Sequence, residues 1–393
     1  MMLRAGWATR MERLSRTRGA RRRTRELART AEHLLRPGLY LRAGESIWRH
    51  WRAVLPRHLR QSKLDARSGT PRALIVNAAH RLLPPLVLRV GRGRGGSFSI
   101  VVSADDGGLV LLAPEHGRVA RTYGSRRIDD DYVSLRRRFE THVVTPAFEV
   151  RDGGRLLVEE FVHGDHFLDL EPDHQLGVVR DLVRRYAELG THEGEGDSRD
   201  PVATTRAAVA RGSPPGEVAE LLSSSRIEAW SRAWPLVPSA TDANVKNLII
   251  RSDRTPVLID LGRIRLDPVF YYPVGVVVMA RGHVLDRFLA GDLDDDLHAL
   301  APGGTAQNRL DDEIRRSLLA LRVAMVSYRR ASTSGTFDRA AFDDILAYRW
   351  SALWSGVPAT YTGSYPADSR SAPGPSSAPG AGPASGSNEG RTA

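Results

Sequence analysis

The sequence predicts an α+β fold in which a small β-rich region, from about residue 90 to 160, precedes a larger helical region, from about 165 to 358. Short β-rich runs separated by turns fill residues 97–123, and apolar residues recur at helical spacing from Pro172 onward. A third feature, at residues 239–262, is a hairpin with polar side chains at both ends. Strands followed by helices in this order are typical of α+β proteins.

Length and composition limit the class of protein. The 393 residues are enough for one two-lobed enzyme or for two domains with full cores. The absence of cysteine excludes disulfides and thiolate metal sites. The sequence contains no run of 18 apolar residues, and its basic N-terminus lacks the apolar stretch of a secretory signal. We therefore expect a cytoplasmic protein.

The basic character of the chain is concentrated in residues 1–62, which we expect to be helical. The first sixty residues hold sixteen arginines and four glutamates, whereas the rest of the chain is close to neutral. The expected helices are Thr9–Leu35 and Ala43–Leu59, the second with Trp48 and Trp51 on one side.

Three interpretations of this basic segment remain open. A basic helix with aromatic side chains can lie on an anionic membrane, so residues 1–60 could associate peripherally with one. The alternative, which we favour, is a solvated helix whose tryptophan side packs on the next domain. A true start at Met11 or later would leave part of the segment untranslated. We expect no specific nucleic-acid partner.

A connector is expected at residues 63–96. It contains an apolar stretch broken by Pro84-Pro85 and ends in the glycine-rich run Gly91–Gly96. That run lacks the Gly-Lys-Ser/Thr ending of a phosphate-binding loop, so we interpret it as flexible and basic.

Residues 97–162 are expected to form the small lobe. Three strands come first, followed by a helix at about Tyr132–Thr141 and an apolar strand at Arg155–Phe161. The three strands are Ser97–Ser103, Leu109–Leu112 and Arg118–Tyr123.

The hairpin at residues 239–262 carries the candidate catalytic groups. Asp242 and Asn247 precede its first strand, and Asp260 follows its second, so the fold of the hairpin brings the three side chains together. The two β-rich runs are Leu248–Ile250 and Val257–Ile259. A carboxylate can accept a proton from an acceptor hydroxyl, while an amide oxygen and a second carboxylate can hold Mg²⁺ against a triphosphate. The alternative is an ordinary surface hairpin with acidic turns.

This pattern of Asp, four residues, Asn, a hairpin and Asp-x-Gly resembles the kinase-like phosphotransferases, namely aminoglycoside phosphotransferases, choline kinases and sugar kinases of the lipopolysaccharide type. The resemblance implies a two-lobed protein-kinase-like fold that uses ATP and Mg²⁺. It implies that Asp242 is the base and that Asn247 and Asp260 are the metal ligands. The family usually has His-Gly or His-x before the base, whereas Ala240 and Thr241 stand here.

The resemblance also implies a nucleotide site in the small lobe. Arg121 stands where the family has a phosphate-binding lysine, and Glu140 is expected to pair with it. Backbone groups near Glu160 and Val162 would bind the adenine edge. The turn at Gly107-Gly108 would cover the nucleotide, although the aspartates before it would face phosphate unfavourably.

The stretch His163-Gly164-Asp165 copies the letters of the family's catalytic loop. No asparagine follows Asp165 at the required spacing, so we interpret His163 and His166 as polar hinge residues.

Residues 163–358 are expected to form the helical lobe, and residues 359–393 a disordered tail rich in Pro, Gly and Ser. The acidic run Asp294–Asp296 is interpreted as a solvated loop. The expected helices are Pro172–Leu189, Val202–Arg211, Gly216–Ser223, Arg226–Trp234, Leu310–Arg330 and Asp338–Trp354.

The sequence therefore predicts an ATP- and Mg²⁺-dependent phosphotransferase acting on a hydroxyl of a small molecule or sugar. The alternative is a pseudokinase that binds nucleotide or serves as a membrane or partner scaffold. It is suggested by the departures at Ala240, at Arg121 and in the short turn at Gly107-Gly108.

Overall fold

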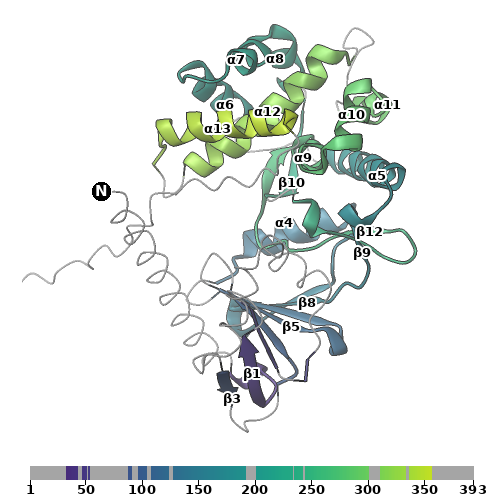
Figure 1. Cartoon of the computed structure of the whole chain (residues 1–393), viewed down its shortest axis with the longest axis vertical. Coiled ribbons are helices and arrows are strands. Elements are labelled where there is room, and N and C mark those ends of the chain that lie inside the picture. Colours follow the sequence, from purple (N-terminus) through teal and green to yellow (C-terminus); the bar gives the residue numbers. More distant parts are fainter. Residues whose placement is uncertain are drawn as a thin grey trace, which may run out of the picture.

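The protein is described from a computed structural model that covers residues 32–42, 47–50, 52–53, 87–90, 96–103, 108–123, 127–191, 201–232, 234–241, 244–300, 310–332 and 336–355. In Figure 1 a sheet forms the lower lobe and a group of helices forms the upper lobe, with short strands at their junction. The predicted two-lobed α+β fold is confirmed.

The small lobe is an eight-stranded antiparallel sheet with the strand order β3-β1-β2-β4-β5-β6-β8-β7. Its strands are β1 (Gly38–Arg42), β2 (Ile47–His50), β3 (Val87–Val90), β4 (Ile100–Ser103), β5 (Leu109–Ala113), β6 (Arg118–Thr122), β7 (Phe148–Arg151) and β8 (Leu156–Glu160). Side chains alternate between its faces, so that Leu109 and Leu111 pack with Tyr40 while Leu112 packs with Ile47. The strands predicted around residues 97–123 and 155–161 are confirmed as β4, β5, β6 and β8.

The prediction of a helix at Ala43–Leu59 is wrong at residues 47–50, which form strand β2. Ile47 is buried against Ile100 and Leu112, and β2 pairs with β4. The predicted connector at 63–96 is likewise wrong at β3, which pairs with β1. The small-lobe sheet therefore draws on residues well before position 97.

The helical lobe is arranged around the long helix α12. This helix packs against α13, α6, α7 and α9. The helices are α5 (Pro172–Thr191), α6 (Pro201–Ala210), α7 (Gly216–Ser223), α8 (Ser225–Arg232), α9 (Tyr271–Ala280), α10 (Gly282–Ala290), α11 (Asp294–His298), α12 (Asp312–Ala331) and α13 (Arg339–Trp354). Asp311 and Asp338 cap α12 and α13 by accepting hydrogen bonds from the amides of Ile314 and Ala341. The six predicted helices are present, with boundaries shifted by a few residues.

The acidic run Asp294–Asp296 is a short helix, and its interpretation as a solvated loop is wrong. Asp296 accepts a 2.8 Å hydrogen bond from Arg184 of α5, and Asp294 accepts one of 2.8 Å from Arg315 of α12. These ion pairs tie α11 to two neighbouring helices.

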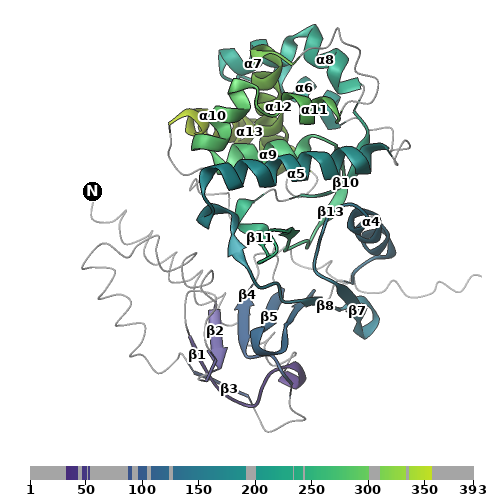
Figure 2. The same cartoon turned by 90° about the vertical axis from the view of Figure 1, so that its right-hand side faces the viewer.

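The junction between the lobes is built from helix α4 and two small sheets. The first sheet pairs β10 with β13, and the second has the order β12-β11-β9. The elements are α4 (Asp130–Glu140), β9 (Asp165–His166), β10 (Leu236–Ala240), β11 (Leu248–Ile250), β12 (Pro256–Leu258) and β13 (Ile264–Pro268). Figure 2 shows α4 beside β10 and β13, and Phe139 of α4 is buried in the core of the helical lobe.

Among the described residues, no helix is long and apolar enough to cross a membrane. The predicted tail at 359–393 and most of the basic segment at 1–62 lie outside these residues.

Candidate active site

Two antiparallel ladders position the loop that carries the predicted catalytic groups. Ala240 at the end of β10 pairs with Ile264 at the start of β13, and Leu248 of β11 pairs with Leu258 of β12. The segment between β10 and β11 and the segment between β12 and β13 therefore lie at the same end of these ladders. Asp242 belongs to the first segment but lies outside the described residues.

Asn247 is held directly beside the Asp-x-Gly segment. It ends a 3₁₀ turn in which the Asn244 side chain accepts a hydrogen bond from the Lys246 amide. The carbonyl of Asn247 accepts a 2.8 Å hydrogen bond from the amide of Ile259, the residue before Asp260. The two predicted metal ligands are thus linked through one backbone contact.

Asp260 stands in a strained and accessible position. Its φ of +58° is in the left-handed region, which costs a non-glycine residue about 1–3 kcal/mol. Its side chain is 49% exposed and forms an ion pair with Arg121 of β6. Strain of this kind is commonly retained at functional sites.

Gly262 completes the Asp260-Leu261-Gly262 segment. A Cβ atom at Gly262 would lie 2.5 Å from Nη1 of Arg121, so glycine allows the guanidinium to reach Asp260. The Asp-x-Gly pattern therefore has a steric basis in this chain.

Arg121 brings positive charge from the small lobe to the junction. Its side chain is only 13% exposed, and its Nε is buried without a hydrogen-bond partner among the described residues. Burial acts to lower the pKa of Arg121, but the charge of Asp260, together with Tyr123 and Glu159, raises that pKa above its usual value.

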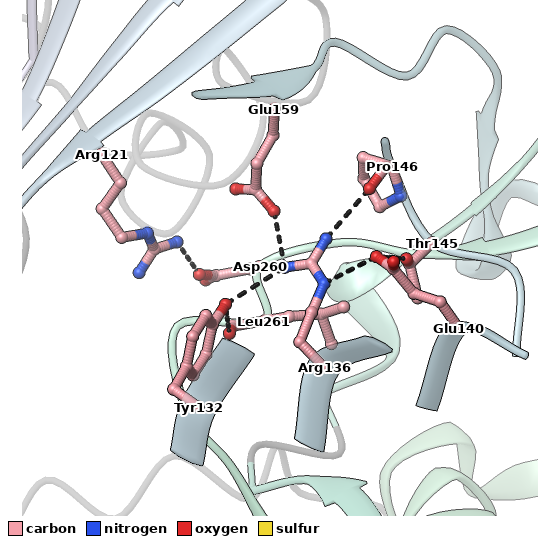
Figure 3. A network of polar contacts seen from close by, with 9 residues as sticks. All are labelled: Arg121, Tyr132, Arg136, Glu140, Thr145, Pro146, Glu159, Asp260 and Leu261. Carbon is pink, nitrogen blue, oxygen red and sulfur yellow. Dashed lines mark hydrogen bonds and ion pairs between the residues drawn. The ribbon is translucent and has the colours of Figure 1, made fainter. Parts of the chain in front are cut away.

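The predicted ion pair between Arg121 and Glu140 is wrong. Glu140 accepts hydrogen bonds from Arg136 Nε at 2.9 Å and from Thr145 Oγ1 at 2.6 Å. Residues 136 and 140 are one helical turn apart and share a face of α4. Figure 3 shows Arg121 directed to Asp260, whereas Glu140 lies on the far side of Arg136.

Arg136 is the buried centre of the network in Figure 3. Its side chain is fully buried and donates to Glu159 Oε1 at 2.9 Å, the carbonyl of Pro146 at 3.0 Å and the hydroxyl of Tyr132 at 3.2 Å. Glu159 on β8 is itself buried. In this chain α4 is therefore joined to the sheet through an arginine of the helix and a glutamate of the strand. This pair was not predicted from the sequence, although a glutamate within the apolar run of strand β8 is a signal for a buried partner.

Tyr132 connects this network to the candidate catalytic segment. Its hydroxyl donates a 2.7 Å hydrogen bond to the carbonyl of Leu261, the residue after Asp260 (Figure 3). Burial raises the pKa of Tyr132, which keeps the hydroxyl protonated and able to donate. The position of Leu261 thus depends on α4.

The predicted adenine-binding hinge follows β8. The amide of Glu160 donates to Ala147, and its carboxylate pairs with Arg251 at 3.0 Å. Val162 is buried against Ile249, and its amide takes part in none of the backbone hydrogen bonds found between described residues. This amide is therefore the hinge donor that a ligand could use.

The nucleotide-covering turn is described only at its end. Gly107 lies outside the described residues, while Gly108 is buried directly before β5.

The segment His163-Gly164-Asp165 has a structural role. Asp165 and His166 form β9 and pair with β11. A Cβ atom at Gly164 would lie 2.2 Å from the carbonyl oxygen of Ile250, so only glycine fits there. Within the described part of the chain, no three His, Cys, Asp or Glu side chains gather as a metal cluster.

No family model and no curated protein matches this sequence. Among solved structures, it is similar to a choline/ethanolamine kinase family protein from Mesorhizobium loti, at 14% identity and a TM-score of 0.40 over 63% of this chain and 85% of that one. It is also similar to a choline kinase from Streptococcus pneumoniae, at 10% identity and a TM-score of 0.40 over 64% and 93% of the two chains.

An aminoglycoside phosphotransferase from Streptomyces rimosus is a third similar structure, at 19% identity and a TM-score of 0.36 over 57% of this chain and 92% of that one. The solved structures that this chain resembles thus include kinases and phosphotransferases of small molecules. Because these identities and TM-scores are low, the similarities do not show what this chain does, and its activity is inferred from its own residues.

Proposed function

We propose that this protein is an ATP- and Mg²⁺-dependent phosphotransferase that acts on a hydroxyl group of a small molecule or sugar. The observation that supports this most directly is the half-exposed Asp260, held in a left-handed backbone conformation opposite the partly buried Arg121. The first supplies a carboxylate for a cation, and the second supplies a guanidinium for a phosphate.

The residues at the junction fit Mg²⁺ and ATP. Asp260 and Asn247 would hold the metal, because hard cations prefer carboxylate and amide oxygens. The guanidinium of Arg121 would bind a phosphate, and the Val162 amide would bind the adenine edge. When bound, magnesium and ATP supply the transferable phosphoryl group and neutralise its charge.

Within this proposal, the chain orients the acceptor and receives its proton. The hydroxyl oxygen of the acceptor forms a bond to the γ-phosphorus, and the bond from that phosphorus to the β–γ bridging oxygen breaks. The hydroxyl proton passes to the carboxylate of Asp242, and ADP leaves. Tyr132 and Arg136 serve as positioning residues. Tyr132 donates a hydrogen bond to the carbonyl of Leu261, the residue after Asp260, and Arg136 donates one to the hydroxyl of Tyr132.

A pseudokinase is the second candidate, and one observation favours it. Arg121 and Asp260 already satisfy each other, so nucleotide and metal must displace an existing ion pair. In that case the lobes would serve as a nucleotide-binding or partner-binding scaffold without transfer.

A melting experiment combined with ADP detection separates the two functions. We expect ATP with Mg²⁺ to raise the melting temperature more than either alone, because a ligand that binds only the folded state stabilises it by mass action. Formation of ADP that depends on an added hydroxyl compound supports the phosphotransferase. Stabilisation without ADP formation from any hydroxyl compound tested supports a nucleotide-binding pseudokinase. No stabilisation at all refutes the phosphotransferase and the nucleotide-binding pseudokinase, and leaves only a partner-binding scaffold.

A cytoplasmic location and peripheral contact of residues 1–60 with an anionic membrane are further parts of this proposal. They rest on the composition of the sequence.

A further inference from the structure

A pocket of about 400 Å³ lies between helix α4 and the start of β13. Thr241 and Gly262 are among its lining residues. The first is the neighbour of Asp242 in the chain, and the second follows Asp260 by two positions. A molecule bound in this pocket therefore lies beside both halves of the candidate catalytic hairpin.

The arginines of this pocket provide an excess of positive charge. Arg127, Arg263 and Arg265 all line it. Neither Arg127 nor Arg263 forms an ion pair with any described residue, and Arg265 shares the buried Asp267 with Arg329. Burial lowers the pKa of Arg265, and the nearby charge of Arg329 lowers it further. An anion beside Arg265 would offset that repulsion.

The two carboxylates of the pocket both lie at the N-terminus of helix α4. Asp129 is the N-cap and accepts a 2.7 Å hydrogen bond from the Tyr132 amide. Asp131 lies in the first helical turn, where the helix dipole stabilises negative charge. The three arginines against these two aspartates leave the lining of the pocket with a net positive charge.

The remaining lining is apolar and aromatic. Leu135 and Ile264 contribute aliphatic surface, and Tyr132 contributes a ring. A volume of about 400 Å³ is in the range of small-molecule sites, and the lining of this pocket mixes charged with apolar side chains. The pocket suits a compact molecule with one hydrophobic face, of about the size of a sugar.

We propose that this pocket binds the phosphoryl acceptor and that the acceptor carries an anionic group, a carboxylate or a phosphate, held by Arg263 and Arg265. This inference rests on the proposed function. The acceptor is then an anionic hydroxy compound of sugar size, whose hydroxyl oxygen forms the new bond to the γ-phosphorus while its proton passes to Asp242 and ADP leaves.

A binding experiment without nucleotide tests the class of ligand. Four matched probes are glucuronate, glucose 6-phosphate, glucose and glucosamine, each titrated against the full chain by ligand-observed NMR. We expect the two anionic probes to bind more tightly than the other two, and their binding to weaken as salt rises. A preference for only one of them would tell whether a carboxylate or a phosphate is recognised, and either preference supports the inference. Equal binding of glucose, or tighter binding of glucosamine, would overturn it, as would no binding of either anionic probe.

Variants connect this binding to the named arginines. The double variant Arg263→Gln/Arg265→Gln should weaken binding of the anionic probe by about tenfold or more, the usual worth of a hydrogen bond to a charged group. The matched control is Arg137→Gln, an exposed arginine of α4 that does not line the pocket, and it should bind like the unaltered chain. Equal affinities in both variants would show that the arginines of the pocket do not hold the anion.

Measurement of ADP formation with the same probes distinguishes failure of this inference from failure of the proposed function. Anionic probes that bind through Arg263 and Arg265 but give no ADP with ATP and Mg²⁺ would refute the acceptor role while leaving an anion pocket. ADP formation with glucose or glucosamine at the rate seen with the anionic probes would refute the anionic class while leaving the phosphotransferase.

Discussion

Replacement of the buried Arg136 tests how much its contacts between α4 and the sheet contribute to the free energy of unfolding. Arg136→Met removes the guanidinium that contacts Glu159, Tyr132, Pro146 and Glu140, and it leaves the Glu159 carboxylate buried without that partner. Breaking a buried ion pair from one side costs about 3–5 kcal/mol. We expect a loss of this size in the free energy of unfolding, measured by urea titration with circular dichroism.

The double variant Arg136→Met/Glu159→Met is the informative comparison. Replacing both members of a buried pair by apolar residues of similar volume is often close to neutral, so the double variant should recover about 2 kcal/mol or more of that loss. Arg137→Met, on the exposed side of α4, is the control and should change stability by about 0.5 kcal/mol at most. If Arg136→Met were as mild as this control, or if the double variant lost the sum of the two single losses, the pair would not fasten α4.

Three further predictions follow from individual contacts. Tyr132→Phe removes the hydrogen bond to Leu261 and should cost only about 1 kcal/mol of stability. It should also lower the affinity for ATP with Mg²⁺, measured by equilibrium titration. Unchanged affinity would contradict the positioning role of Tyr132. Burial lowers the pKa of His166 in the folded chain, so below the ordinary histidine pKa of about 6.5 the unfolded chain binds a proton more readily. The melting temperature of the unaltered chain should therefore fall more from pH 7 to pH 5 than that of His166→Gln. Parallel melting curves of the two proteins would refute this prediction. Binding of the full chain to anionic vesicles should weaken as the salt concentration rises. Removal of residues 1–31, which contain ten arginines, should abolish this binding. Association that does not depend on salt would exclude the membrane proposal.

Local patterns predicted much of the fold because short segments carry their own signals. The continuous apolar run Leu109–Leu112, with a turn after it, indicates a strand, and β5 buries side chains on both of its faces. The amphipathic run from Pro172 indicates α5, since its apolar residues recur every three or four positions. The hairpin at β11 and β12 was predicted to within one residue for the same reason.

Long-range pairings were not predictable in this way. Strand β10 contains Pro238 and shows no alternation of apolar and polar residues. Strand β13 does alternate from Ile264 to Asp267, but neither run indicates its partner, and their register joins Leu236 to Pro268. Strand β2 was mistaken for a helix because apolar residues at positions 47 and 51 suit either period in so short a stretch.

The candidate site was predicted only in part, because a motif carries residue types and not their partners. Asp260 and Arg121 do meet at the junction, but Arg121 pairs with Asp260 and not with Glu140. Which carboxylate an arginine reaches depends on how α4 is rotated against the sheet. That rotation is set by the buried contact between Arg136 and Glu159.

The most direct test of the proposed chemistry compares Asp242→Asn with Asp260→Asn in turnover and in equilibrium binding of ATP with Mg²⁺. Asp242→Asn keeps the shape of the side chain and removes the proton acceptor, so turnover should fall on the order of 10²–10⁴-fold with nucleotide binding little changed. Asp260→Asn removes a charged oxygen ligand, so the Mg²⁺-dependent part of nucleotide binding should be lost. Equal and mild effects of the two substitutions would contradict the account, because the hairpin would then not be the active site.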